Sequence, residues 1–228
     1  MTRRDERLAG VIALLTGLLL SASLVLRGSG PSSAQPEAVL GWYARNAEIV
    51  RAGSLVWLAA MLGFVVFAVL LRDALLALTA GRWWAGVLFV QGAAVFATVV
   101  VIAAATGWAT TALATGPDPH PETVAALWTL NGTLLRFATW GLAVPLVTVG
   151  LTLARHSTMG KVTAVAGIAV AVTLLVPATW AYGLPAFAGW VLLTSLTLLV
   201  PRNQATRLVA PGVPSESSQV ADTDERDS

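Results

Sequence analysis

The sequence has no cysteine, and it has few charged residues. Without cysteine the chain forms no disulfide, no thiolate metal site and no cysteine nucleophile. Only 11% of its 228 residues are charged, against about 25% in a typical soluble domain. Its two histidines, His120 and His156, lie far apart and match no metal-ligand spacing such as HExxH. These scarcities disfavour both metal chemistry and a water-soluble fold.

Motifs of catalysis and of nucleic-acid binding are also missing. There is no Walker A loop, no G-x-S-x-G motif and no carboxylate pair on an apolar helix. The formal net charge is only +2, and the 14 basic residues are spread along the chain rather than clustered. We therefore expect a protein that is not an enzyme, with no catalytic, cofactor-binding or metal-binding residues and no nucleic-acid partner.

What the chain has in abundance is apolar sequence, at 56% of its residues. A soluble fold of this length cannot bury that much apolar surface, whereas a lipid bilayer accommodates it. Spanning the hydrocarbon takes roughly 20 apolar residues in a helix, because backbone polar groups in lipid must be satisfied within the segment. Six stretches without Asp, Glu, Lys or Arg fit: Leu8–Leu26, Ala52–Leu71, Trp84–Thr106, Phe137–Ala154, Val162–Ala181 and Leu184–Val200. The prediction is an all-α polytopic membrane protein with a six-helix transmembrane bundle embedded in the lipid bilayer.

Basic residues predict the orientation of these spans. If the N-terminus is inside, the inner segments hold ten Arg and Lys residues, and the outer segments hold Arg27, Arg45 and Arg51. This balance favours both termini in the cytoplasm. The expected organisation is a cytoplasmic N-terminus (1–7), a six-helix transmembrane domain (8–200) and a polar, acidic, disordered cytoplasmic tail (201–228). The alternative for the first stretch is a cleaved signal peptide, but its apolar run is longer than the usual core of about 7–15 residues.

Two segments outside the second and fourth spans resemble one another at a constant offset of 85 residues. Pro36-Glu37 corresponds to Pro121-Glu122, Asn46 to Asn131, and Arg51 to Arg136. Pro followed by Glu is typical of a helix start. We therefore predict that spans 2 and 4 carry extracytoplasmic helical extensions, whose apolar faces pack together as a cap. These faces consist of Val39, Tyr43, Ala47 and Val50 on one extension and Val124, Leu127, Trp128 and Leu135 on the other. Duplication of a two-helix unit and convergence on the same helix-entry chemistry both explain the similarity.

Two places contain polar residues that could form a site. The outer segments carry a possible contact site of Tyr43, Arg45, Asn46, Glu48, Asn131 and Arg136, near Asp118 and His120. Glu48 is spaced to pair with Arg45 and Arg51, and interfacial snorkelling to headgroups is the alternative role for Arg136. Within the membrane the strongest polar residue is Gln91, which fits an interhelical hydrogen bond or a substrate path.

Tryptophans and small residues indicate helix packing. We expect Trp57, Trp140 and Trp190 to pack between helices, because they lie deep within their spans. Small residues four apart recur, and the first two pairs are Gly17/Ser21 and Ala59/Gly63. Such pairs allow close helix approach within one bundle and between copies alike, so they leave the oligomeric state open.

A family resemblance follows from one stretch of the chain. The run Trp42-Tyr43-Ala44-Arg45-Asn46, the apolar span to Leu71 and the turn containing Arg72 resemble an uncharacterised six-span bacterial family of unknown function. That family is common in actinobacteria and has a tyrosine-rich helix before its second span. The resemblance implies a six-helix integral protein of the bacterial plasma membrane, and it transfers no activity and no catalytic residues.

Two functions are compatible with these observations. The first is a non-enzymatic scaffold, accessory or sensory component whose outer cap contacts an unknown membrane or extracytoplasmic partner. The alternative is a small transporter or lipid-handling permease with a mostly apolar path lined by Gln91 and threonines. A bundle filled to its centre, with a grooved outer cap, favours the first function, and a deep polar-lined cavity between the third and fourth spans favours the second.

Overall fold

The computed structural model describes residues 3–27, 30–31, 33–78, 84–154, 158–176 and 180–199. Over these residues the chain is all-helical, without strands. The helices are α1 (Arg3–Arg27), α2 (Pro36–Arg45), α3 (Ala47–Leu78), α4 (Trp84–Ala114), α5 (Pro121–Ala154), α6 (Thr158–Leu175) and α7 (Trp180–Leu199). The predicted tail at 201–228 lies outside the described residues, as does His156.

Within the described residues, five helices are long and apolar enough to cross a membrane. They contain the segments Arg7–Leu26, Ala47–Asp73, Trp84–Ala114, Pro121–Ala154 and Tyr182–Leu199. A sixth apolar segment, Gly160–Leu175 of α6, is shorter. At 1.5 Å per residue, the 31 residues of α4 and the 34 residues of α5 are about 46 and 51 Å long. Both helices therefore exceed a hydrocarbon core of about 30 Å.

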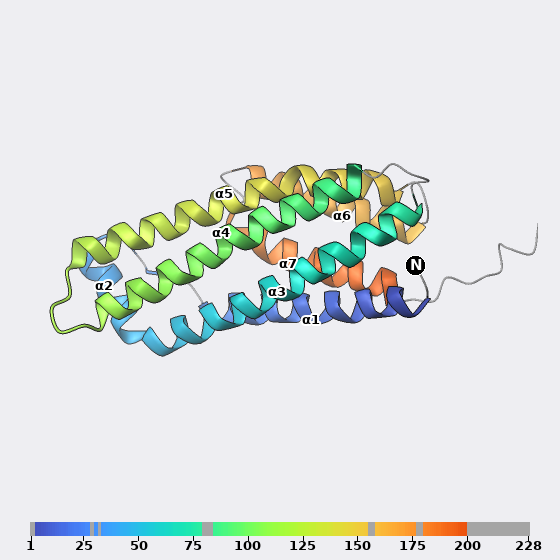
Figure 1. Ribbon diagram of the computed structural model, residues 1–228. Helices are drawn as coiled ribbons and strands as arrows, with labels where there is room; N and C mark the ends of the chain where they lie inside the picture. The colour runs from blue at the N-terminus through green and yellow to red at the C-terminus, as the bar shows by residue number, and fades with distance from the viewer. Residues whose placement is uncertain are drawn as a thin grey trace, which may run out of the picture.

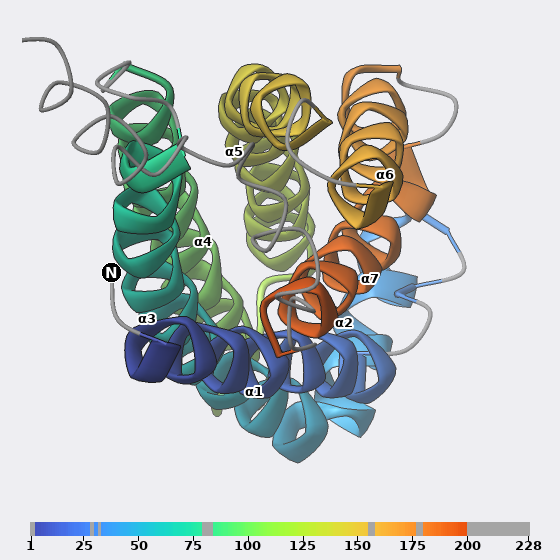
Figure 2. The same cartoon turned by 90° about the vertical axis from the view of Figure 1, so that its right-hand side faces the viewer.

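Six of the helices form a closed ring (Figures 1 and 2). Following the chain, α1 packs against α3, α3 against α4, α4 against α5, α5 against α6 and α6 against α7. Helix α7 returns to α1 and closes the ring. The short helix α2 lies apart from this ring and packs mainly on α5 and α4.

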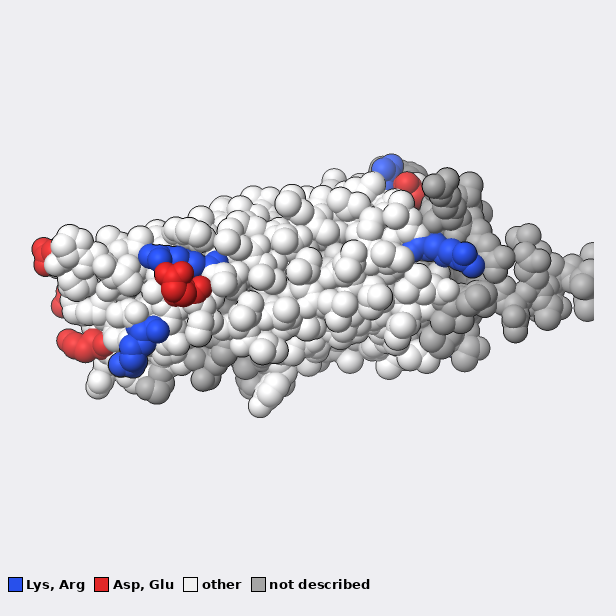
Figure 3. Space-filling model, turned by 90° about the horizontal axis from the view of Figure 1, so that it is seen from below, with Lys and Arg blue, Asp and Glu red and all other residues white. Residues whose placement is uncertain are grey.

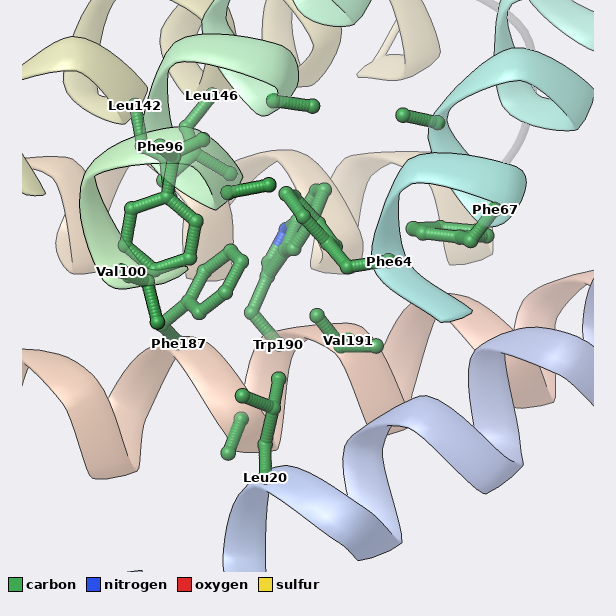
Figure 4. Packing of buried hydrophobic residues seen from close by; sticks show 14 of the residues in the cluster. Leu20, Phe64, Phe67, Phe96, Val100, Leu142, Leu146, Phe187, Trp190 and Val191 are labelled. Carbon is green, nitrogen blue, oxygen red and sulfur yellow. The ribbon is translucent and has the colours of Figure 1, made fainter. Parts of the chain in front are cut away.

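Aromatic side chains fill the centre of the ring (Figure 4). Phe64 of α3 is fully buried, and its ring centroid lies 5.8 Å from that of Phe96 on α4 and 5.3 Å from that of Phe187 on α7. Both contacts are edge-to-face, the arrangement that aromatic quadrupoles favour. Trp190 completes the cluster, and its indole N–H donates a hydrogen bond of 3.1 Å to the carbonyl of Thr163 on α6. Helices on opposite sides of the ring therefore meet through aromatic side chains.

Glycines bring neighbouring helices of the ring into close contact. A Cβ atom on Gly17 of α1 would lie 2.6 Å from the Leu192 side chain of α7. A Cβ on Gly63 of α3 would meet the Thr16 hydroxyl of α1, and one on Gly92 of α4 would meet the Pro145 ring of α5. Gly17 and Gly63 belong to the predicted small-residue pairs, so these two act within the bundle.

Three sequence expectations differ from the structure. The second span and its extension are two helices, because the helical backbone is interrupted at Asn46 between α2 and α3. The helix of the third span does not end at Thr106, since α4 continues to Ala114. Trp140 does not pack between helices: it is 48% exposed and stacks edge-on against Phe137 on the outer surface of α5. Trp57 and Trp190 are buried as predicted.

Candidate functional site: the cap

At one end the molecule continues beyond the ring as a smaller unit, which we call the cap. It consists of α2, the first turns of α3 and α5 and the last turns of α4, together covering residues 36–50 and 107–135. Figure 1 shows that α1, α6 and α7 stop short of this end. The cap is therefore where the chain presents residues outside the six-helix ring.

A small apolar cluster holds the cap together. Val39 and Tyr43 of α2, Val50 of α3, Ala114 of α4 and Val124 of α5 pack against one another and are at most 5% exposed. This packing confirms that the two extensions meet through apolar residues, although Leu135, which was predicted to belong to this face, packs in the core of the ring instead. Sequence reasoning missed the contribution of α4. The run of small residues after Thr106 was the available signal, since it continues the apolar face of α4.

Two asparagines of the predicted contact site bind backbone carbonyls. Asn131 of α5 is 5% exposed, and its amide donates a hydrogen bond of 2.9 Å to the carbonyl of Ala103 on α4. Asn46 donates from its amide and from its backbone N–H to the carbonyl of Trp42, at 2.8 and 3.0 Å. Asn46 thus ends α2, whereas α5 runs unbroken through Asn131. Two positions that align in the sequence have different backbone structures, and both side chains are used in holding the cap.

The charged residues of the predicted contact site lie on the surface of the cap or, for Arg136, directly beside it. Arg51 donates to Glu48 at 2.7 Å, which confirms that predicted pair. Arg45 is exposed, and its guanidinium lies beside Gly41 of its own helix rather than beside Glu48. Arg136 is exposed on α5, and Tyr43 is buried in the apolar cluster. The structure therefore brings these residues into one region, with the arginines on its surface and Tyr43 inside it.

Charge is layered along the molecule. In the face seen in Figure 3, charged side chains gather at the two ends and leave a broad uncharged belt between them. Arg51 and Arg72, both on α3, are 21 residues apart, about 31 Å along a helix. This distance matches the thickness of a hydrocarbon core. The tip of the cap, farther out, carries exposed acidic residues: Glu37, Asp118 and Glu122.

The predicted intramembrane residue Gln91 does not point into the ring. It is exposed on the outer face of α4. Inside the bundle lies an apolar pocket with a cavity volume of about 10 Å³, which is room for about one water molecule. It is lined by Leu20, Leu24, Trp57, Met61, Phe96, Val100, Leu184 and Phe187. Gln91 is therefore not part of this interior pocket.

Comparisons with known proteins add no relative. No protein family, curated protein or solved structure matches the chain. Among the residues described in the structure, no group of three His, Asp or Glu side chains is placed to hold a metal ion.

Proposed function

We propose that the chain is a six-span protein of a bacterial plasma membrane that performs no catalysis and acts through its cap. Both termini face the cytoplasm in this proposal, so the cap is extracytoplasmic. The role is that of a scaffold, accessory or sensory component. The membership in the six-span bacterial family suggested by Trp42-Tyr43-Ala44-Arg45-Asn46 belongs to the same proposal.

The position of α6 supports the sixth span. Although its apolar segment is shorter than the other five, α6 occupies a place in the ring between α5 and α7. Its carbonyl at Thr163 accepts a hydrogen bond from buried Trp190, so α6 is packed into the bundle at the depth of the aromatic cluster. A helix held there lies alongside the membrane-spanning segments.

The observation that carries the proposal is the filled centre of the ring. A conduction path needs space or polar groups along the axis of a bundle, and here Phe64, Phe96, Phe187 and Trp190 occupy that axis. The cap, by contrast, presents charged side chains to its surroundings. A protein whose membrane part is closed and whose projecting part is polar on its surface suits recognition better than transport.

Flux through purified protein in liposomes tests this proposal. We expect the uptake of amino acids, sugars and ions, and the exchange of fluorescent lipids between leaflets, to equal the values of protein-free liposomes. The double variant Phe64→Ala/Phe187→Ala serves as a positive control for flux, because removing two central aromatic rings opens space along the axis of the bundle. Saturable uptake or rapid lipid exchange by the unaltered protein would instead support the transporter or permease.

A further inference from the structure

The outer face of α4 carries polar side chains where a lipid-facing surface is expected to be apolar. Gln91 is exposed, and so is Thr98, seven residues later. Gly86, near the start of the same helix, packs against Arg72, which marks the end of the uncharged belt that is farther from the cap. Gln91 and Thr98 are 5 and 12 residues beyond Gly86, or about 8 and 18 Å into the hydrocarbon. Both side chains therefore lie at depths where water cannot bind them.

Neither polar group finds a partner within the part of the chain that the structure describes. Many threonines in the helices donate to the carbonyl three or four residues earlier, as Thr106 and Thr110 do on the same helix. No such hydrogen bond is formed by Thr98, and the Gln91 amide makes none either. A polar group facing lipid without a hydrogen bond costs free energy, which a neighbouring helix can recover.

These residues belong to a regular seam. The positions Trp84, Gln91, Thr98, Ala105 and Ala112 follow one another at intervals of seven residues, and all are exposed. A spacing of seven is the repeat by which two helices keep the same face in contact along a left-handed supercoil. Ala94 and Ala109 are exposed beside this seam. Small side chains at such positions let two backbones approach closely.

The seam also extends past the membrane. Helix α4 is about 46 Å long, roughly 16 Å more than the hydrocarbon core. In this outer part Trp108 is 42% exposed and Leu113 is 46% exposed. Figure 1 shows α4 running along the molecule with no other helix in front of it. Lipid chains account for an apolar face within the bilayer, but not for its continuation into the cap.

We propose that this face of α4 binds α4 of a second copy of the chain, forming a parallel dimer about a two-fold axis along the membrane normal. A second copy suits the seam because an amide is both donor and acceptor, so two facing Gln91 side chains satisfy one another. Two facing Thr98 hydroxyls do the same. Residues that lie on the axis meet their own equivalents, as an isologous interface requires. This inference needs α4 to be in the membrane, and it does not depend on what the cap recognises.

Single cysteines test the dimer directly, because the natural chain has none. Thr98→Cys and Ala105→Cys place a thiol on the seam, and a disulfide forms only when two Cα atoms come within about 7 Å. We expect both variants to give a covalent dimer when oxidised in native membranes. Ala59→Cys, at an exposed position on α3, is the matched control and is expected to stay monomeric.

The unaltered seam is tested by counting subunits in lipid nanodiscs or by single-molecule photobleaching in liposomes. Gln91→Leu combined with Thr98→Val removes both polar groups and is expected to lower the dimer association constant about tenfold. Thr148→Val on α5, whose hydroxyl already binds the Val144 carbonyl, is the control and leaves dimerisation unchanged. A chain that stays monomeric at high density, cross-links to a different protein only, or cross-links equally through Ala59→Cys would overturn the proposal. The subunit count does not enter the flux experiment. The dimer can therefore be disproved without disproving the proposed function, and the proposed function without disproving the dimer.

Discussion

The ring and the cap are held together by different means. In the ring, aromatic side chains from α3, α4 and α7 meet at the centre, and glycines such as Gly92 let helices touch. In the cap, Tyr43 and four small or medium side chains form the core, and Asn131 and Asn46 supply hydrogen bonds to backbone carbonyls. In the proposed membrane placement the ring therefore depends on shape, because lipid gives no hydrophobic driving force between helices. The cap has an apolar core of its own, and its surface carries charged residues beside exposed apolar ones such as Trp108 and Leu113.

The largest expected effect comes from the centre of the ring. Phe64→Ala removes a fully buried side chain that contacts four other aromatic rings. We expect a loss of about 3–5 kcal/mol in unfolding free energy, because the cavity cannot collapse between helices. Denaturant titration in mild detergent measures this change. Val124→Ala in the cap cluster is the comparison. An equal loss of unfolding free energy in that variant would show that buried side chains stabilise the ring no more than they stabilise the cap.

A second comparison uses two glycines inside helices. Gly92→Ala in the ring places a methyl group against Pro145 and about 3.0 Å from the Gly141 carbonyl, so we expect a loss of about 1–3 kcal/mol. Gly132→Ala in the cap meets nothing within 4 Å. That variant is expected to be neutral or to stabilise by up to about 1 kcal/mol, because alanine favours a helix. Thermal unfolding of both purified variants decides whether close packing is confined to the ring.

A third prediction concerns the hydrogen bond by which Asn131 of the cap binds Ala103 of α4, where the cap meets the ring. Asn131→Leu removes the side-chain donor to the Ala103 carbonyl, which keeps its backbone hydrogen bond within α4, and is expected to cost about 0.5–1.5 kcal/mol. The loss falls on local opening of the cap, so hydrogen exchange should quicken in the first turns of α5 and stay slow near Phe64. Uniformly faster exchange along the whole bundle would contradict the separation of ring and cap.

The smallest effect is expected at the surface of the cap. Glu48 is 84% exposed in its ion pair with Arg51, and such pairs contribute about 0–1 kcal/mol. Glu48→Gln should therefore change stability by no more than this amount, and the difference should vanish in high salt. Denaturant titrations at low and high ionic strength measure it. A large, salt-independent loss would mean that Glu48 has a structural role.

The apolar stretches and helix-entry signals predicted much of this architecture. Pro121-Glu122 correctly marks the start of α5, and the apolar faces of the two extensions do pack together as expected. The break at Asn46 was beyond the sequence pattern, because the apolar periodicity from Val39 to Val50 continues across it. Trp140 was assigned to the wrong surroundings, and the exposed position of Gln91 was not foreseen, since composition alone does not show which side of a span faces lipid. That choice depends on how α4 and α5 are rotated in the ring.

In the proposed placement the cap lies outside the membrane and the ring lies within it, and one measurement tests this placement directly. Single cysteines placed along the exposed side of α5 in the natural cysteine-free chain are labelled in intact cells with a membrane-impermeant maleimide. Thr129→Cys and Thr133→Cys should react with the maleimide, and Val144→Cys and Leu151→Cys should not. The boundary between labelled and unlabelled positions should lie near Arg136. Labelling at Val144, or labelling at Thr129 only after the cells are opened, would contradict the proposed placement of ring and cap.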